Sequence, residues 1–258
     1  LDLGNLEFMQ HNVVINSLTP LRSAVGHPWY SYYVLKTEGI FQSQEEIDNF
    51  TWRDPETGIK QKVQPNAKPG DFKYVDFNND GKITDDDKQY LGSYMPKITF
   101  GFGGNLQWKG IDFSFQFQGV GKSTVYNGFK QMGYTGRGQG GNMLADVKNS
   151  WEYNKTSGVP RIGLISDPNG NYNSLNDFFL EDASYLRLKN VTIGYTLPDN
   201  VMRAIGLPGS TARFYLNGEN LFTATDYSGI DPEVGNFGID GGTYPVARSF
   251  SIGFNFSF

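Results

Sequence analysis

Val246-Ala-Arg-Ser-Phe-Ser-Ile-Gly-Phe-Asn-Phe-Ser-Phe258, at the carboxyl end of the chain, decides the fold class. From Phe250 onward, apolar residues occupy the even positions and small polar or glycine residues the odd ones, the period of a β-strand. A strand over 246–258, tilted by about 45°, just crosses a hydrocarbon layer roughly 30 Å thick. Strands of soluble proteins are typically about half as long. The stretch therefore favours a membrane barrel strand over the alternative of a soluble sandwich strand.

The composition supports a β-barrel membrane protein. The chain of 258 residues is 15% aromatic and contains 32 glycines, yet only 38% of it is hydrophobic. Such a balance is expected when only alternate residues meet lipid. A net charge of -5 without a basic run argues against nucleic acid as a partner, and the absence of cysteine excludes disulfides and thiolate sites. Because the chain begins at Leu1 without a signal-peptide pattern, we interpret it as a fragment lacking its amino-terminal part.

About seven strands are predicted from alternation and turn residues. The clearest pair is a hairpin of residues 98–108 and 111–121, joined by the tight turn Lys109-Gly110. The other predicted strands cover residues 12–18, 27–41, 185–197, 212–222 and 246–258. The sequence thus predicts an all-β fold: an antiparallel transmembrane β-barrel.

The segment 27–41 carries Trp29, Tyr30, Tyr32 and Tyr33. Aromatic residues with a polar tip gather at membrane–water interfaces, so this cluster suits such an interface. The alternative is a soluble strand with an exposed face rich in tyrosine.

Connections alternate between short ones, at 109–110 and 198–210, and long ones, at 42–96, 123–181 and 223–245. This asymmetry is typical of a barrel with short periplasmic turns and long extracellular loops. The loop 123–181 is long enough to suggest a function. Four of its residues are candidates for holding a sugar or peptide by stacking and hydrogen bonding, although each could equally belong to a small core of the loop itself: Trp151, Tyr153, Arg161 and Tyr172.

A calcium loop is predicted within residues 71–92. Asp76, Asn78 and Asp80 occupy positions 1, 3 and 5 of an EF-hand-like loop, with Gly81 at position 6. The Lys82 carbonyl falls at position 7, and Asp87 at position 12 replaces the usual glutamate. Alternate residues of a tight loop can converge their oxygens on one cation, so we expect a structural calcium ion that makes the loop rigid.

No catalytic constellation emerges from the sequence. The two histidines, His11 and His27, are far apart, and the carboxylates lie mostly in predicted loops. The chain is therefore not expected to be an enzyme.

Several segments together resemble the carboxyl-terminal part of SusC/RagA-type TonB-dependent outer-membrane transporters. The matching stretches are Gly-His-Pro at 26–28 through Tyr-Tyr at 32–33, Glu-Gly-Ile-Phe-Gln-Ser at 38–43, Pro-Gly-Asp-Phe-Lys-Tyr-Val-Asp at 69–76 with the calcium-like loop, Pro-Lys-Ile-Thr-Phe-Gly at 96–101, Phe-Gln-Gly-Val-Gly at 117–121, Leu-Glu-Asp-Ala-Ser-Tyr-Leu-Arg-Leu-Lys-Asn-Val-Thr at 180–192, Asn-Gly-Glu-Asn-Leu-Phe-Thr at 217–223, Asp-Pro-Glu at 231–233 and the terminal Phe258.

The resemblance implies that residues 1–258 form the last strands of a barrel of roughly 22 strands, with the plug domain outside this chain. It also implies import of oligosaccharides, and sometimes peptides, through the outer membrane of a Gram-negative bacterium. A SusD-like surface lipoprotein would be one partner. TonB, reached through the missing amino-terminal part, would be another, and outer-membrane lipid would surround the barrel.

A second interpretation is a secreted or surface β-module that binds carbohydrate and carries a calcium loop, without transport activity. The two readings differ in where the aromatic side chains lie. A binding module buries them against a second sheet, whereas a barrel directs them at lipid.

Overall fold

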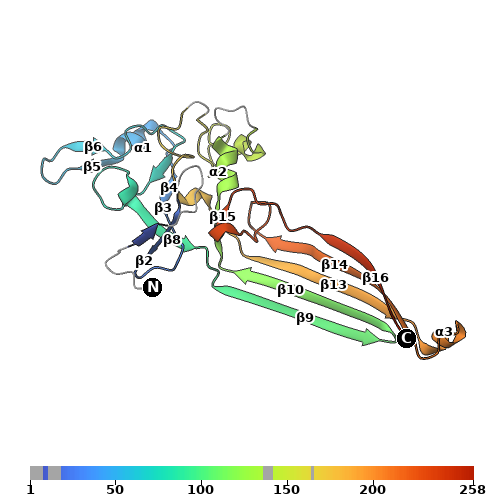
Figure 1. The fold of residues 1–258 in the computed structure, drawn as a ribbon. Coiled ribbons are helices and arrows are strands. Elements are labelled where there is room, and N and C mark those ends of the chain that lie inside the picture. The colour runs from blue at the N-terminus through green and yellow to red at the C-terminus, as the bar shows by residue number, and fades with distance from the viewer. Residues whose placement is uncertain (1–7, 11–18, 136–141, 164–165) are drawn as a thin grey trace. The chain divides into compact units, whose positions relative to one another are not determined.

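The structure is a computed structural model that describes residues 8–10, 19–135, 142–163 and 166–258. The chain separates into two compact units (Figure 1). Unit 1 comprises Leu1–Met95, Thr124–Glu181 and Val234–Thr243, and unit 2 comprises Pro96–Ser123, Asp182–Glu233 and Tyr244–Phe258. Each unit is therefore assembled from three separate stretches of sequence.

Unit 2 is built on one antiparallel sheet with the strand order β16-β14-β13-β10-β9. Its strands are β9 (Ile98–Trp108), β10 (Ile111–Gly121), β13 (Tyr185–Thr196), β14 (Thr211–Thr225) and β16 (Ser249–Ser257), with the short helix α3 (Asp199–Ala204) between β13 and β14. The hairpin of β9 and β10 has the predicted bounds. Its turn residues Lys109 and Gly110 have φ of 47° and 84°, the left-handed values that a two-residue hairpin turn requires.

The register places apolar side chains in rows on one side of this sheet. One row runs through Leu106, Phe113, Ile193, Leu216 and Ile252, and all five side chains are exposed. No second sheet is packed on this side within the described part of unit 2. The aromatic and aliphatic residues thus face outward, which confirms the predicted antiparallel barrel wall and not a sandwich.

Polar side chains line the opposite side and bond to one another across strands. Asn190 Nδ2 and Thr192 Oγ1 donate to Asn217 Oδ1 at 2.9 and 2.8 Å. Closer to the hairpin turn, Arg213 Nε donates to Asp112 Oδ1 at 2.8 Å across the intervening strand β13. A Cβ at Gly194 would lie 2.5 Å from both side chains, so only glycine leaves room for this ion pair.

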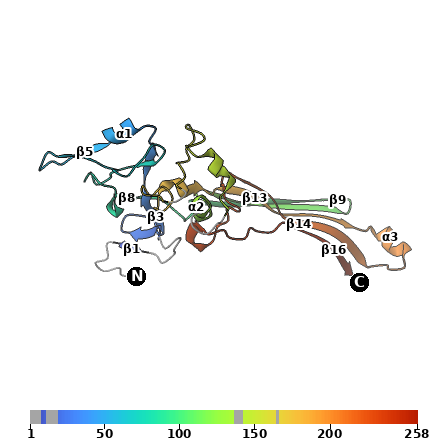
Figure 2. The same ribbon diagram turned by 90° about the horizontal axis from the view of Figure 1, so that it is seen from above.

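The sheet is curved. Seen from above in Figure 2, β14 and β16 bend away from the plane of β9 and β10. Twist and curvature of this kind are the normal consequence of strand chirality and are required for closure into a barrel.

The last strand is shorter than predicted, because β16 begins at Ser249 and not at Val246. The preceding backbone is held by side chains instead of by a neighbouring strand. Val246 N donates to Asp231 Oδ2 at 3.0 Å, and Asn220 Nδ2 donates to the Ala247 carbonyl at 3.0 Å. Asn220 has a φ of 51° at the point where the register between β13 and β14 shifts. A bulge in β14 therefore ends the ladder before 246–248 can join it.

Unit 1 contains short elements in small sheets. Its elements are β1 (Phe8–Gln10), β2 (Leu21–Ala24), β3 (Ser31–Leu35), β4 (Thr37–Ile40), α1 (Gln44–Asn49), β5 (Thr51–Arg53), β6 (Lys60–Lys62), β7 (Phe72–Tyr74), η1 (Asp85–Asp87), β8 (Lys88–Ser93), β11 (Thr124–Asn127), α2 (Gly128–Thr135), η2 (Ala145–Asn149), η3 (Asp177–Phe179), β12 (Leu180–Asp182, which ends in unit 2), η4 (Asn236–Gly238) and β15 (Ile239–Asp240). The helix α1 begins at Gln44, with Ser43 as its cap.

Unit 1 has its own hydrophobic core, in which residues from all three stretches meet, among them Tyr32, Tyr126 and Ile239. Tyr126, Tyr134, Tyr172 and Phe179 are buried together, and the rings of Tyr134 and Tyr172 stack with centroids 5.4 Å apart. The long connections are thus folded parts of a compact unit, and not open loops.

Tyr32 is the residue that ties the stretches of unit 1 together. Its side chain is fully buried, and its hydroxyl donates to the carbonyl oxygens of Gly238 at 2.8 Å and Thr124 at 3.0 Å. Burial raises the pKa of this phenol well above its usual range. The predicted membrane-interface role of the cluster at 29–33 is therefore wrong for Tyr32, which packs in a protein core with Leu21 of β2 and Tyr126 of β11.

Five of the predicted strands form the sheet of unit 2. Of the other two, 27–41 lies in unit 1 as β3 and β4, and 12–18 falls outside the described residues. Within the described ranges, no helix has both the length and the apolar character needed to cross a membrane.

The outward side of the sheet yields a prediction. Phe102 lies near the middle of β9 and stacks on Phe117, with ring centroids 4.9 Å apart. The substitution Phe102→Arg places a charge on this outward side and is expected to cost about 2–4 kcal/mol of unfolding free energy in lipid. Guanidinium unfolding of the full-length protein in phospholipid vesicles measures the loss.

Gln116→Arg is the matched control, because Gln116 pairs with Gly103, the residue after Phe102, and lies on the polar side of β10. It should lose much less stability than Phe102→Arg. Equal losses for both variants would contradict the assignment of the two sides.

Candidate functional site

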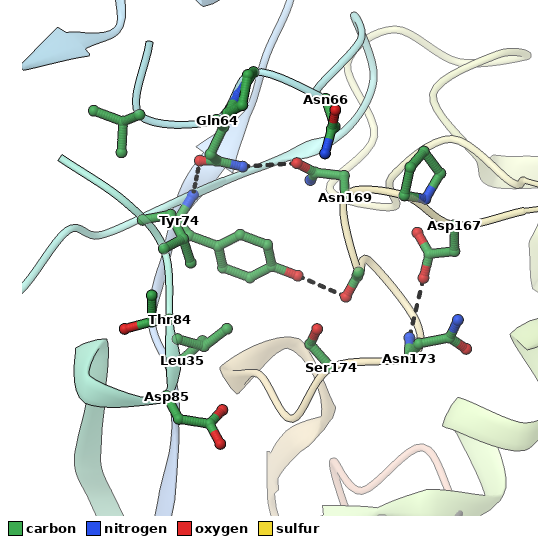
Figure 3. Close-up of a pocket in the computed structure, with 15 residues that line it drawn as sticks. Leu35, Gln64, Asn66, Tyr74, Thr84, Asp85, Asp167, Asn169, Asn173 and Ser174 are labelled. Carbon is green, nitrogen blue, oxygen red and sulfur yellow. Dashed lines mark hydrogen bonds between the residues drawn. The ribbon is translucent and has the colours of Figure 1, made fainter. Parts of the chain in front are cut away.

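One cavity in unit 1 has a volume of about 430 Å³ and is open to one side. It is lined by residues 63–66, 83–85, 167–170 and 173–174, together with Leu35 and Tyr74 (Figure 3). Figure 3 shows the side chains of Asn66, Asp167 and Ser174 around this space. All of these residues belong to unit 1, so the cavity lies within one compact body.

Amide side chains hold the walls of the cavity in place. Gln64 accepts from the Tyr74 backbone N–H at 2.8 Å, and its own Nε2 donates to Phe72 O at 2.9 Å and Asn169 Oδ1 at 2.8 Å. The Tyr74 hydroxyl donates to the Gly170 carbonyl at 2.8 Å. These bonds join the segment after α1 to the loop around 170. They leave a polar cavity whose shape is set by buried side chains.

The loop 167–173 is closed by a single carboxylate. Asp167 accepts from the backbone N–H groups of Asn171, Tyr172 and Asn173 at 2.9, 2.8 and 3.0 Å. This arrangement satisfies three donors that the turn would otherwise leave without partners. The cavity wall carries amides and hydroxyls together with the carboxylates of Asp85 and Asp167, so it can offer hydrogen bonds to a polar ligand.

A buried ion pair between Asp71 and Arg161 stabilises the same region of unit 1. Asp71 is fully buried, and the Arg161 guanidinium lies 2.6 Å from one carboxylate oxygen and donates to the other at 3.1 Å. Asn171 Nδ2 adds a bond to Asp71 Oδ1 at 2.8 Å. Arg161, predicted as a ligand contact, is thus committed to the core of unit 1.

The other predicted ligand contacts are separated by the fold. Tyr172 is buried, stacks on Tyr134 and donates its hydroxyl to Pro160 O at 2.8 Å, so its ring is not accessible to a ligand. Trp151 is partly buried and donates Nε1–H to Gln42 Oε1 at 2.9 Å. Tyr153 is exposed. Of the four, Tyr153 and the partly buried Trp151 remain predicted contacts, although the Lys155 ammonium lies 3.1 Å from the centroid of the Trp151 ring. Tyr172 and Arg161 belong to the alternative, the core of the loop itself.

The predicted calcium loop adopts a tight turn. Asp76 accepts from the backbone N–H groups of Asp80 at 3.1 Å and Gly81 at 2.8 Å. Gly81 has a φ of +81°, and a Cβ there would lie 2.6 Å from the indole of Trp52. Only glycine therefore fits at position 6, as predicted for the sharp bend.

The last predicted ligand, Asp87, has a different role in this conformation. Its carboxylate is buried and accepts from the backbone N–H groups of Phe77 at 2.8 Å and Thr84 at 2.7 Å. Among the described residues, no three carboxylate or histidine side chains are grouped so that they could hold a metal ion. The side chains of Asp76, Asn78 and Asp80 and the Lys82 carbonyl are chemically suited to calcium, and the backbone N–H of Asp80 donates to both Asp76 Oδ1 and Asn78 Oδ1 at 3.1 Å. Calcium binding stays a prediction.

Sequence reasoning did not single out a charged cluster in unit 2. Arg187 on β13 is only 2% exposed, and it donates to Asp231 Oδ1 at 2.6 Å and Glu233 Oε2 at 2.7 Å. Lys189 also donates to Glu233, at 3.0 Å. These bonds fasten the Asp-Pro-Glu segment to the polar side of the sheet. The sequence feature that could have indicated this cluster was an arginine between two leucines, in a strand where apolar and polar residues alternate.

The carboxyl of Asp231 is held in its charged form. Burial alone would raise its pKa, but hydrogen bonds from Glu233 N, Val246 N and Arg187 outweigh burial, and the pKa lies below its usual value. The cluster is therefore an ion network that positions the segment after β14.

Comparisons with known proteins bear on the family. No protein-family model matches the chain. TonB-dependent receptor P26 of Formosa agariphila is 36% identical over 272 residues, which cover 100% of this chain and 26% of that protein. TonB-dependent receptor SusC of Bacteroides thetaiotaomicron is 29% identical over 199 residues, covering 77% of this chain and 19% of SusC.

Solved structures agree. The RagAB peptide importer in its closed-closed state matches with a TM-score of 0.68 and 27% identity, over 97% of this chain and 25% of the matched chain. The structure of the RagAB peptide transporter gives a TM-score of 0.69 and 26% identity over 98% and 24%. The chain thus spans about a quarter of the length of these relatives.

The outward apolar rows, the polar opposite side and these relatives define the class: this is part of the β-barrel of a TonB-dependent receptor, not of an enzyme. Within that class, the chain belongs to the SusC/RagA-like transporters.

The buried pair in unit 1 yields a prediction. Arg161→Met leaves the Asp71 carboxylate buried without its cation, which is expected to cost about 3 kcal/mol or more of local stability. Hydrogen exchange of the peptide spanning β7 in the whole transporter should become faster. Lys62→Met is the control, because Lys62 pairs with Asp48 on the surface, and an exposed pair contributes little. Unchanged exchange in Arg161→Met would contradict the role assigned to this pair.

The predicted calcium loop leads to a further testable prediction. Calcium should slow hydrogen exchange over residues 76–87 of the whole transporter, with a dissociation constant of about 10⁻⁴ to 10⁻³ M, as in extracellular modules. Asp80→Ala should abolish the effect. Asp85→Ala should retain it, because Asp85 lies outside the predicted ligand positions and pairs with Lys88. No response to calcium in the unsubstituted protein, or equal loss in both variants, would sink the prediction.

Proposed function

We propose that the protein containing this chain imports large nutrients across the outer membrane of a Gram-negative bacterium, using energy delivered through TonB. The observation that carries this proposal is the exposed apolar side of the unit 2 sheet. Phe100, Phe102 and Trp108 on β9, with Phe250 and Phe254 on β16, lie uncovered in the described structure. Exposed aromatic rows of this size are costly in water and are stabilised by lipid.

The transported ligands are oligosaccharides, with peptides as the second class. The relation to the RagAB peptide importer supports peptides, and the sequence resemblance to SusC/RagA-type transporters supports oligosaccharides. The chemistry of unit 1 agrees with both, because its cavity presents amide and hydroxyl groups and no uncompensated cluster of charge. We propose that unit 1, including the segment 123–181, lies on the extracellular side and contributes to ligand contacts.

A SusD-like surface lipoprotein is the proposed partner. The RagAB relatives support a two-component importer of this kind. TonB would act through parts of the protein outside residues 1–258. Buried hydrogen bonds and an ion pair connect the segments of unit 1, so its surface would be rigid enough for a lipoprotein to bind.

The alternative function is a secreted or surface module that binds carbohydrate and calcium without transport. It requires the aromatic residues of the sheet to be buried against a second sheet. In the described part of unit 2 those residues are exposed, which favours the transporter.

Fractionation and heat-modifiable gel mobility of the full-length protein test the proposal. We expect the protein in the outer-membrane fraction, extractable only with detergent, and migrating faster unheated than boiled because a barrel stays folded in the gel. Growth of a deletion strain on candidate oligosaccharides and peptides, with and without TonB, then identifies the ligand class. A soluble, monodisperse protein without detergent would support the binding module instead.

A further inference from the structure

The connection between β13 and β14 carries an amphipathic helix at one end of the sheet. Thr196 N donates to the Gly110 carbonyl at 2.7 Å, so this connection lies beside the β9–β10 hairpin turn. Thr211 pairs with Ser257, which brings the end of β16 to the same place. Figure 1 shows α3 at this end of the sheet, close to the carboxyl terminus.

The two sides of α3 differ in character. Val201 and Ile205 are four residues apart and therefore share one side, and both are exposed. Asp199 and Arg203 share the other side, where Arg203 Nε donates to the Asp199 carbonyl at 3.4 Å. Leu207, just after the helix, adds a third exposed apolar side chain. Three neighbouring aliphatic residues thus form an uncovered patch on a short turn.

The helix packs onto the sheet through Met202. Met202 is 1% exposed, and α3 contacts β14, whose first apolar-side residue, Ala212, is 4% exposed. The partner of Ala212 on β16 is Phe256, which is 42% exposed, whereas Ile252 further along the same strand is 84% exposed. Ala212 and Met202 are therefore covered where α3 packs on the apolar side of the sheet. Ile205 lies three residues after Met202 and is its neighbour on the helix surface, so the exposed aliphatic residues adjoin the side of α3 that packs on the sheet.

The aromatic residues at the hairpin-turn end of the sheet indicate the level of this end in the membrane. Trp108, Tyr195 and Phe214 lie in one row across β9, β13 and β14, the row nearest the hairpin turn. Tryptophan and tyrosine on the outward side of a barrel mark the level where hydrocarbon gives way to headgroups. Lys109, directly after Trp108, places its ammonium 5.0 Å from the indole centroid. The row therefore marks the interface, and α3 begins just beyond it.

On the basis of the outer-membrane location proposed above, we propose that α3 and Leu207 form an interfacial anchor in the inner leaflet. Val201, Ile205 and Leu207 enter the boundary between headgroups and acyl chains, while Asp199 and Arg203 remain in the headgroup and water layer. Amphipathic helices bury their apolar side to about 5–10 Å in this region. The occupant of the patch is a phospholipid leaflet, because the patch adjoins the side of α3 that packs on the lipid-facing side of the sheet.

Site-directed fluorescence in the full-length transporter tests the anchor. The environment-sensitive dye NBD is attached to Ile205→Cys, and the matched control is Arg203→Cys on the polar side of the same helix. This chain contains no cysteine, and the unsubstituted transporter labelled in parallel corrects for thiols elsewhere. In phosphatidylcholine vesicles, doxyl-labelled lipid should quench the label at 205 at least about twofold more than the label at 203, while aqueous iodide shows the reverse order.

A third label, at Phe254→Cys on the apolar side of β16, separates this inference from the proposed function. If doxyl lipid quenches at 254 but not at 205, the barrel stands and the anchor is wrong. If it quenches at neither position, the membrane location itself fails. Protection of 205 from both quenchers would show that protein covers the patch, which also overturns the anchor. Heat-modifiable mobility of each labelled variant confirms that the barrel has folded.

Discussion

The structure depends on one constraint: every strand of the unit 2 sheet must keep its apolar side chains on the same side. Because successive side chains of a strand point in opposite directions, a slip of one residue in any pairing would turn a whole row of aromatic residues to the polar side. The Asp112–Arg213 pair over Gly194, and the bonds among Asn190, Thr192 and Asn217, favour the observed register from the polar side. Charge and aromatic packing thus specify the same alignment.

Unit 1 follows a different principle, because its elements are too short to be stable alone. Strands of three to five residues make few ladder bonds, so buried side chains connect the segments. Tyr32 donates to two carbonyls from distant parts of the chain, Gln64 joins two loops, and Asp71 binds Arg161 and Asn171. In a low-dielectric interior such satisfied polar networks specify one arrangement of loops. That arrangement produces the cavity.

Much of unit 2 was predictable, because its information is local. The hairpin bounds, the strand at 185–196 and the apolar side of each strand follow from alternation and from the turn at Lys109-Gly110. The predicted strand bounds are wrong where side-chain hydrogen bonds replace backbone pairing between strands. The bulge at Asn220 and the bond from Val246 to Asp231 shortened the last strand, and neither is visible in a period-two pattern.

The sequence alone determined the class of protein, since strand periodicity, aromatic content and the stretches that resemble the family can all be read without the structure. Only the tertiary structure decided which polar and aromatic residues are accessible. Tyr172 and Arg161 have the chemistry of ligand contacts, but both side chains are packed and bonded in the core of unit 1, whereas Tyr153 is exposed. Arg187 likewise acquired its partners only when the segment after β14 folded back onto β13. Accessibility depends on contacts between residues remote in sequence, and no local pattern encodes those contacts.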